Sequence, residues 1–353
     1  MFKKIFIVIL LSFLSLQDSH AEKIKVWHGL AGELGNHFQT IVDDFNHSLK
    51  KKGAVFEIEA ELKGAYDEVV KAYLAVAIDA RPDIVQAYEM ATRLMLESKS
   101  LDGRAVYVPV HQVMQHARVN LNEDNFLPQI LLFYRAGGLQ LPSIPFNAST
   151  VVLYYNKTAL TNAKLTPIAT FEQFEQQMAQ LKEAGEPTGI GSGWLSGHHF
   201  DQIGARHNKQ IASYGNGVDS PDAHLSFDRF FTFHLKKLQD WYKKGWFSLE
   251  QGPKAEQAFA DGKIVYLSQG GNRHSDILKA VGGRFEVGVT VFPYWAAIGK
   301  PFNTIAGGGS FWVANKNQSC ERIRIIAEFL SYLVSPEVQA KWQRLSGYIP
   351  VVK

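Results

Sequence analysis

The chain has 353 residues, of which 46% are hydrophobic, 12% aromatic and 20% charged, and its formal net charge is +3. This composition is typical of a globular protein and excludes an intrinsically disordered one. The length is sufficient for two hydrophobic cores, and the small net charge gives no indication of a nucleic-acid or acidic-surface partner.

The first 21 residues have the pattern of an export signal. Lys3 and Lys4 precede an apolar run over residues 5–16, and Ser19-His20-Ala21 forms a small-x-small cleavage site. The apolar run is too short to cross a bilayer as an anchor. We therefore expect residues 1–21 to be a signal peptide and the mature chain to be exported.

Cys320 is the single cysteine of the sequence. One cysteine cannot form an intramolecular disulfide, and its distance from the cleavage site excludes a lipid anchor on a mature N-terminal cysteine. We expect a freely diffusing protein in the periplasm of a two-membrane bacterium.

The first part of the mature chain alternates predicted strands and helices. Strands are expected over 23–27, 56–62 and 84–88, and the helix after the first strand carries an apolar stripe of Leu34, Phe38, Ile41, Val42, Phe45 and Leu49. A second helix is expected over 66–80, ended by Arg81-Pro82-Asp83. This alternation predicts a parallel sheet, whose ligands bind beyond the carboxyl ends of its strands. Glu89 follows one such end.

The stretch 145–157 is a polar turn that leads into a strand of Val, Leu and Tyr. Two interpretations are open. It is a strand that crosses between two lobes, with Ser149 and Thr150 facing the cleft, or it is an interior strand whose hydroxyls cap a neighbour.

The remaining elements continue the mixed pattern. Thr170 and Gln173 form a capping box for a helix that reaches about residue 184, and a glycine-rich turn over 189–193 precedes Trp194. A loop is expected over 213–225. Helices are predicted over 228–244, with Phe230, Phe231, Phe233, Leu238 and Trp241 in the core, over 255–260, along the stripe 323–333 and after Ser335-Pro336, and strands over 264–267, 287–292 and 311–314. No linker separates two domains, which favours lobes joined by structured strands.

Six sequence blocks occur in the order found in a known family. They are Trp27-His28-Gly29 with Gly32-Glu33-Leu34-Gly35, Lys63-Gly64-x-Tyr66, Gln86-x-Tyr88-Glu89, Phe146-Asn147-x-Ser149-Thr150-x-Val152-Leu153-Tyr154-Tyr155-Asn156-Lys157, Gly307-Gly308-x-Ser310-x-Trp312-Val313 and Gly347-Tyr348-x-Pro350. With them the chain resembles the glycerol-3-phosphate-binding receptors of ABC importers, in extracellular solute-binding protein family 1. The resemblance implies an α/β, maltose-binding-protein-like fold of two lobes, with an inter-lobe cleft and crossing hinge strands. Lobe I is expected to contain 22–148 and 306–346, and lobe II 149–305 and 347–353.

The resemblance also assigns roles to individual residues. Glu89 by itself is either a solvated strand end or a carboxylate that accepts hydrogen bonds from two adjacent hydroxyls, and the family pattern favours the second. The other ligand-binding residues that it implies are Tyr66 and Tyr348 at the glycerol moiety, Trp194 as a platform, and Ser149, the Gly308 N–H and Gly270 at the phosphate. Without the resemblance, plain packing is an equally good interpretation of Tyr66 and Tyr348, Trp194 is a half-buried core residue, and Ser149 and the glycines only serve turn geometry.

Three departures from the family pattern bear on the ligand. The family's second tryptophan corresponds to Gly197. Its phosphate-site serine corresponds to Gly270, so that only a backbone N–H or the nearby Ser268 is left as a phosphate donor there. The sequence ends at Lys353, before the arginine that binds the phosphate in the family. We expect the loss of such a charge-assisted bond to weaken binding about ten- to a hundredfold and the lost helices to leave an apolar patch on the second lobe.

The resulting hypothesis is a monomeric, non-enzymatic receptor with no cofactor and no metal. It captures glycerol 3-phosphate or a glycerophosphodiester such as glycerophosphocholine and delivers it to an inner-membrane ABC permease. One alternative is an exported hydrolase of glycosides or phosphodiesters, with candidate carboxylates Glu33, Asp67, Glu68 and Glu89. Another is a truncated remnant that binds nothing. A metal site at His198, His199, Asp201 and His207 is not expected, because adjacent histidines point apart.

Overall fold

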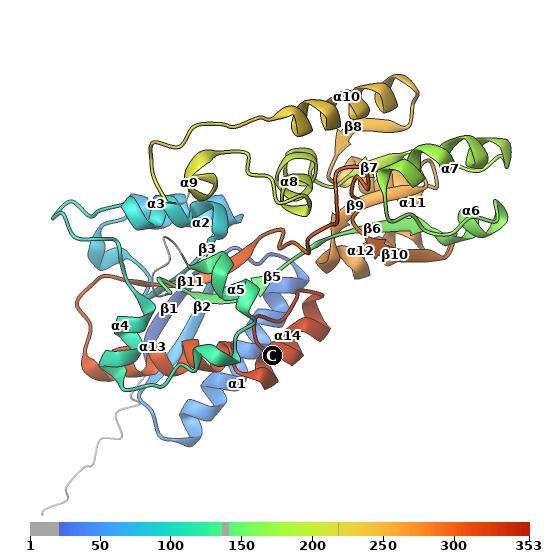
Figure 1. Cartoon of the computed structure of the whole chain (residues 1–353). Coiled ribbons are helices and arrows are strands. Elements are labelled where there is room, and N and C mark those ends of the chain that lie inside the picture. The colour runs from blue at the N-terminus through green and yellow to red at the C-terminus, as the bar shows by residue number, and fades with distance from the viewer. Residues whose placement is uncertain (1–20, 136–140, 218) are drawn as a thin grey trace, which may run out of the picture.

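Two β-sheets, each covered by helices, form the computed structural model, which describes residues 21–135, 141–217 and 219–353. The sheets belong to two lobes that lie side by side in Figure 1, the first at left and the second at right. The predicted signal peptide lies, apart from Ala21, outside the described residues. The two-lobe α/β fold predicted from the sequence is confirmed.

The first lobe is built on a six-stranded sheet with β11 near its centre. Its strands are β1 (Glu22–His28), β2 (Phe56–Leu62), β3 (Ile84–Tyr88), β4 (Tyr107–Val108), β5 (Ile144–Ala148) and β11 (Gly308–Ala314). β1 pairs in parallel with β2 and β3, as the strand–helix alternation predicted. β11 is antiparallel to β3, β4 and β5, so the sheet is completed by a strand from late in the chain.

Helices cover both faces of this sheet. They are α1 (Glu33–Lys51), α2 (Tyr66–Ala75), α3 (Thr92–Glu97), α4 (Val110–Ala117), α5 (Pro128–Tyr134), α13 (Cys320–Leu333) and α14 (Pro336–Ser346). The predicted stripe of α1 is buried at Phe38, Ile41, Val42, Phe45 and Leu49, where it packs with α13 and α14. The second predicted helix ends at Ala75 rather than residue 80, because Val76 is extended, and Ile78–Ala80 forms a separate 3-10 turn.

The second lobe contains a five-stranded sheet in the order β10-β6-β9-β7-β8. These strands are β6 (Val151–Asn156), β7 (Ile190–Ser192), β8 (Phe247–Gln251), β9 (Tyr266–Gly270) and β10 (Val287–Val291). The helices of this half are α6 (Lys157–Asn162), α7 (Phe171–Glu183), α8 (Ile203–Arg206), α9 (Ser213–Asn216), α10 (Arg229–Lys243), α11 (Pro253–Ala260) and α12 (His274–Val281), together with a π-helix over Gly197–Gln202.

Two sequence predictions about helices of this lobe can be compared directly with the structure. The capping box is present, because Thr170 accepts from the Gln173 N–H and the Gln173 side chain accepts from the Thr170 N–H. Of the five aromatic and aliphatic residues predicted as core on α10, four are buried and Phe233 is partly buried against the same core.

Two chain segments join the lobes and run next to each other. The first passes from β5 to β6 through Ser149 and Thr150, and the second returns through residues 302–307 to β11. The Ser149 N–H donates to Gly307 O and the Ala306 N–H donates to Ser149 O, both at 2.8 Å. The stretch 145–157 therefore crosses between the two sheets, as the first interpretation predicted, and its second half, β6, is an interior strand of the second sheet.

The last residues pack on the first lobe, whereas we expected 347–353 in the second. Tyr348, Val351 and Val352 lie in the first-lobe core, and the Leu127 N–H donates to Val351 O at 3.0 Å. The apolar pair Val351-Val352 is buried there, and this burial holds the segment in place. Contact with the second lobe is made at Gly347 (φ 71°), where a Cβ would lie 3.1 Å from the Cα of Asn272.

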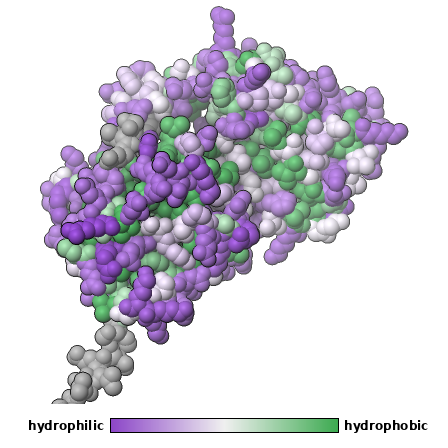
Figure 2. All heavy atoms as spheres, turned by 60° about the horizontal axis from the view of Figure 1, so that its bottom comes forward, coloured by the Kyte–Doolittle hydropathy of each residue, from purple (hydrophilic) through white to green (hydrophobic). Residues whose placement is uncertain are grey.

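The edge strand β10 leaves apolar side chains in solvent. Val289 and Val291 remain 43% and 51% exposed. Figure 2 shows apolar residues gathered on a face of the second lobe, at right in that view.

Among the described residues, no helix combines the length and apolar character needed to cross a membrane.

Candidate functional site

Four tyrosines surround Asn147 at the edge of the first lobe that faces the hinge. Tyr66 begins α2 and Tyr88 ends β3, and their rings stack with centroids 5.3 Å apart. The Asn147 amide donates to the Tyr66 hydroxyl at 3.3 Å, and the Tyr134 hydroxyl donates to Asn147 O at 2.9 Å. Tyr348 hydrogen-bonds to Tyr66 and Asn147. Three of the phenol groups are thus bonded to Asn147, and Tyr88 joins them through its ring contact with Tyr66.

Glu89 lies beside this cluster, directly after β3. Its Oε2 accepts a hydrogen bond from the Gly308 N–H at 2.9 Å, and the Tyr88 hydroxyl donates to the same carboxylate. Burial raises the pKa of Glu89 to about 7, although these hydrogen bonds act in the opposite direction. The negative charge of Asp201, from the second lobe, raises it further. Glu89 is thus a partly buried carboxylate that faces the other lobe.

The structure gives Gly308 a partner that the sequence prediction did not include. We expected its N–H at the phosphate, but here it donates to Glu89. Glycine is required at this position because a Cβ would collide with Asn147 O, and at Gly307 a Cβ would lie 2.8 Å from Glu89 Oε1. In this conformation the glycines position the carboxylate.

Ser149 and Gly270 face each other at the start of the second lobe. A Cβ on Gly270 would lie 3.3 Å from Ser149 Oγ and would overlap the Asn272 side chain, so the glycine leaves room for both neighbours. The Ser149 hydroxyl is 3.4 Å from Asn272 Oδ1, and the Gly271 N–H donates to Thr150 O at 3.0 Å. Both predicted phosphate-side residues therefore lie together at the hinge.

Arg273 follows this loop and adds a positive charge that the sequence analysis missed. Its guanidinium is paired with Glu256 at 3.0 Å and with Asp276 at 2.5 Å. Burial raises the pKa of Tyr348, and the charge of Arg273 acts against that rise, so the arginine lies within electrostatic reach of the first-lobe cluster. Its position three residues after Gly270 is the signal that would have identified it.

Trp194 lies at the same edge of the second sheet as Gly270, because Ser192 of β7 pairs with Ser268 of β9. Its indole is half-buried and lies over Gly197, where any Cβ would overlap the ring. This overlap explains one departure from the family pattern, since a second tryptophan at 197 does not fit beside Trp194 in this arrangement. The π-helix then runs to Asp201, opposite Glu89, and to Gln202, which donates to Ile305 O at 2.9 Å.

Ser268 is not available as a replacement phosphate donor. It is fully buried, and its hydroxyl and that of Ser192 both hydrogen-bond to His198 Nδ1, at 3.1 and 3.0 Å. His199 and His234 are also buried, with His199 Nδ1 3.3 Å from His234 Nε2. Among the described residues, no group of three or more His, Cys, Asp or Glu side chains is placed to hold a metal ion.

The predicted residues form two groups on opposite sides of the hinge. Tyr66, Glu89, Gly308 and Tyr348 belong to the first lobe, whereas Ser149, Gly270 and Trp194 lie at the facing edge of the second. The contact of Gly347 with Asn272 connects the groups, and the carboxylates of Glu89 and Asp201 repel each other across the hinge. Sequence reasoning missed Asn147, Tyr88 and Asp201, although Tyr88 is adjacent to Glu89 in the sequence.

Comparison with known proteins places this arrangement in a family. The model of the bacterial extracellular solute-binding proteins matches residues 40–353. The chain is a bacterial extracellular solute-binding protein.

Within this family, the chain is similar to proteins named for glycerol 3-phosphate binding. This solute-binding protein is 34% identical to the sn-glycerol-3-phosphate-binding periplasmic protein UgpB of Yersinia pseudotuberculosis over 337 residues, which are 93% of this chain and 74% of that one. It is 32% identical to UgpB of Salmonella typhimurium over 336 residues, again 93% and 74% of the two chains. The resemblance stated from the six sequence blocks is confirmed.

Solved structures agree on the fold. UgpB of Mycobacterium tuberculosis in complex with glycerophosphocholine gives a TM-score of 0.71 at 18% identity, over 94% of this chain and 80% of that chain. Maltose-bound MalE3 of T. maritima gives 0.72 at 15% identity, over 94% and 82%. At these identities the likeness establishes the maltose-binding-protein-like fold of this solute-binding protein.

Proposed function

We propose that this solute-binding protein captures glycerol 3-phosphate or a glycerophosphodiester in the periplasm and, as a monomer, delivers it to an ABC importer. The ligand lies between the lobes, with its glycerol hydroxyls at Glu89 and the tyrosines and its phosphate at the second-lobe edge. The relatives named as glycerol-3-phosphate-binding proteins support this choice over the sugars bound by structures of the same fold.

One observation carries the proposal. Glu89 is held at the edge of the first lobe by the Gly308 N–H and the Tyr88 hydroxyl, and it faces the second lobe. A carboxylate has acceptor capacity for about four hydrogen bonds, so beside the Gly308 N–H, the Tyr88 hydroxyl and its own backbone N–H it can still accept from a polyol hydroxyl. Neighbouring phenol rings supply flat apolar surface for the carbon chain.

The second-lobe edge supplies neutral groups for an anion. The Ser149 hydroxyl and the backbone around Gly270 are neutral donors, and Arg273 lies close by with its charge paired to Glu256 and Asp276. Neutral N–H and O–H donors bind a phosphate without a full countercharge. Closure of the lobes is then driven by contacts that the ligand makes with both edges at once.

Isothermal titration with glycerol 3-phosphate, glycerophosphocholine and maltose tests the proposal. We expect saturable binding of the two glycerol phosphates and none of maltose. Binding of maltose alone contradicts the proposed ligand class. Phosphate and choline release is measured in the same samples, because turnover favours the alternative of an exported hydrolase, for which Glu89 and Asp201 are the acids that face each other.

A further inference from the structure

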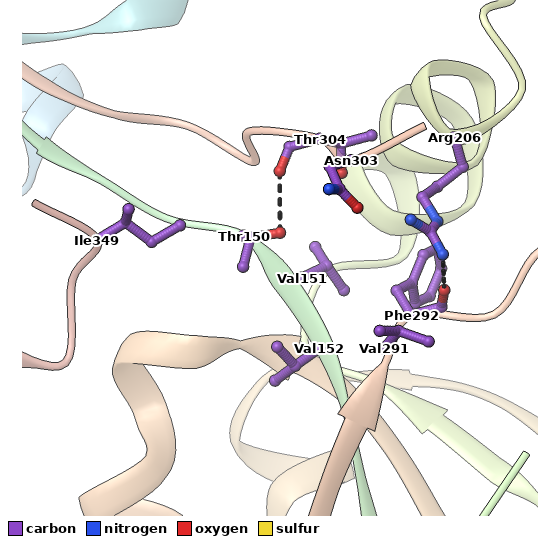
Figure 3. Close-up of a pocket in the computed structure, with 9 residues that line it drawn as sticks. All are labelled: Thr150, Val151, Val152, Arg206, Val291, Phe292, Asn303, Thr304 and Ile349. Atoms are coloured by element: carbon purple, nitrogen blue, oxygen red, sulfur yellow. Dashed lines mark hydrogen bonds between the residues drawn. The ribbon is translucent and has the colours of Figure 1, made fainter. Parts of the chain in front are cut away.

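A cavity of ≈ 290 Å³ lies beside the hinge, and none of its lining residues belongs to the cluster around Glu89 (Figure 3). The nine residues that line it are Thr150, Val151, Val152, Arg206, Val291, Phe292, Asn303, Thr304 and Ile349. They come from β6, the end of β10, α8, the returning crossing segment and the last segment of the chain. The cavity therefore lies where the chain passes between the lobes.

Most of the cavity wall is apolar. Val151, Val152, Val291, Phe292 and Ile349 form it, and the Thr150 hydroxyl donates to Thr304 O at 2.9 Å instead of facing an empty space (Figure 3). Val291 is 51% exposed, so the rim on the β10 side is open to solvent. A ligand that enters from this side meets hydrocarbon first.

Arg206 supplies the one charged side chain of the lining, and it is only 6% exposed. Its guanidinium donates to Phe302 O at 2.7 Å and to Phe292 O at 2.9 Å, while its buried Nε has no hydrogen-bond partner. Within the described ranges, no carboxylate forms an ion pair with it. Burial lowers the pKa of Arg206, which reflects the cost of an uncompensated charge.

Burial of the Arg206 guanidinium without a neighbouring anion costs free energy, because the charge loses its hydration. Two carbonyl dipoles offset part of the charge, but a buried cation normally has a carboxylate or another anion beside it. An anion in the adjacent cavity would supply that charge and accept from the unpaired Nε. The apolar walls require that the anion also carry hydrocarbon.

We propose that the hinge cavity binds a small alkyl carboxylate, with its charged end at Arg206 and its chain against the valines and Phe292. The volume is at the lower end of the range of about 300–1,000 Å³ found for ligand pockets, which restricts the ligand to a short chain. A single guanidinium among apolar side chains matches a monoanion better than a phosphate dianion, which binds best with several donors.

A ligand bound in this cavity changes the equilibrium between inter-lobe angles. Thr150, Asn303 and Ile349 belong to the segments that cross or lie along the hinge. A ligand that prefers one inter-lobe angle shifts the equilibrium toward it and, by linkage, changes the affinity of the inter-lobe site.

Isothermal titration of the whole protein with hexanoate, hexan-1-ol and inorganic phosphate tests the proposal. Hexanoate is expected to bind at one site, and the alcohol and phosphate at least about tenfold more weakly, because each lacks one of the two recognition elements. Equal binding of the alcohol, equal binding of phosphate, or no saturable hexanoate binding overturns it.

Variants locate the site. Arg206→Met should lower hexanoate affinity at least about tenfold, and Arg206→Lys should retain most of it. Arg206→Met also removes two hydrogen bonds to carbonyls. Val291→Trp therefore serves as a second test, because it fills the open rim of the cavity and removes no side-chain hydrogen bond. Unchanged hexanoate affinity in folded Val291→Trp contradicts the location. Glu89→Ala should keep its hexanoate affinity, and loss of it would place the ligand in the inter-lobe site instead.

Discussion

The two lobes present their site residues in different ways. In the first lobe, Glu89 is held by a backbone N–H and a phenol hydroxyl, and the tyrosines around Asn147 are linked to one another. In the second lobe, the Ser149 hydroxyl makes only a long contact of 3.4 Å, and Gly270, the last residue of β9, is partly exposed. The first lobe is therefore a preorganised half-site, and the second completes it on closure. Preorganised contacts contribute more affinity because less ordering is required on binding.

The largest expected effect is that of Glu89→Ala on binding. Removal of the carboxylate deletes its charge-assisted hydrogen bonding to the glycerol end, so affinity for glycerol 3-phosphate should fall about ten- to a hundredfold. Circular dichroism should place the thermal midpoint within a few degrees of the parent. Asp67→Ala on α2, which removes an exposed carboxylate paired with Lys71, is the matched control and should leave binding unchanged. A collapsed fold in Glu89→Ala would show instead that Glu89 is structural.

Affinity should also depend on pH through the same residue. Burial holds the pKa of Glu89 near 7, and the deprotonated form is the better acceptor for hydroxyls. Binding of glycerophosphocholine, whose phosphodiester does not titrate in this range, should weaken by up to about tenfold for each pH unit below 7 and level off above about pH 8. A flat profile between about pH 5 and 8 would mean that Glu89 binds no hydroxyl.

A smaller effect is expected at the second half-site. Ser149→Ala removes one neutral donor, so affinity for glycerol 3-phosphate should fall about five- to tenfold. Thr150→Val is the matched control, since its hydroxyl already donates to Thr304 O at 2.9 Å, and titration should find its affinity within about threefold of the parent. If Ser149→Ala weakens binding as much as Glu89→Ala does, the two half-sites are equally preorganised and the contrast between the lobes is wrong.

The smallest effect concerns the stability of the second lobe in acid. Among the described residues, four of the five histidines whose pKa is lowered lie there, and burial lowers the pKa of His198 to about 3 and of His199 to about 4. The unfolded chain binds these protons near pH 6.5, so stability is lost as the pH falls from about 6.5 to 4.

Two measurements test whether the second lobe loses stability in acid more than the first lobe does. The thermal midpoint should fall by about 5 °C or more between about pH 7 and pH 5, and hydrogen exchange should rise more in α10 than in α1. His199→Phe, which removes one titratable group, should reduce the slope of the midpoint against pH. An equal rise of exchange in both lobes would show that the histidines do not determine acid sensitivity.

Local sequence patterns predicted most elements of the fold. The stripe of α1, the capping box at Thr170 and the strand 56–62 were visible because each depends on neighbours a few residues apart. The packing of residues 347–353 on the first lobe was not visible in the sequence, because Val351 and Val352 are buried against residues more than 200 positions earlier. Long-range burial leaves no periodic signal in a short segment.

The candidate site shows the same limit. The sequence blocks identified Tyr66, Glu89, Ser149 and Tyr348, and the structure brings the first, second and fourth into one cluster. The partners of each residue were not predictable, since the bond from Gly308 to Glu89 and the charge of Asp201 arise only when distant segments meet. Gly197 looked like a missing tryptophan in the sequence, and the position of Trp194 shows why a side chain does not fit there.

The place of β11 in the chain has a consequence for biosynthesis. This strand pairs with β3, β4 and β5, yet it is translated after every strand of the second lobe. The first lobe therefore cannot complete its sheet until all strands of the second lobe have been synthesised, whereas the described strands of the second lobe follow one another without interruption. During synthesis of the second lobe, the unfinished sheet of the first lobe therefore has unpaired strand edges, which are the kind of surface that promotes misassembly.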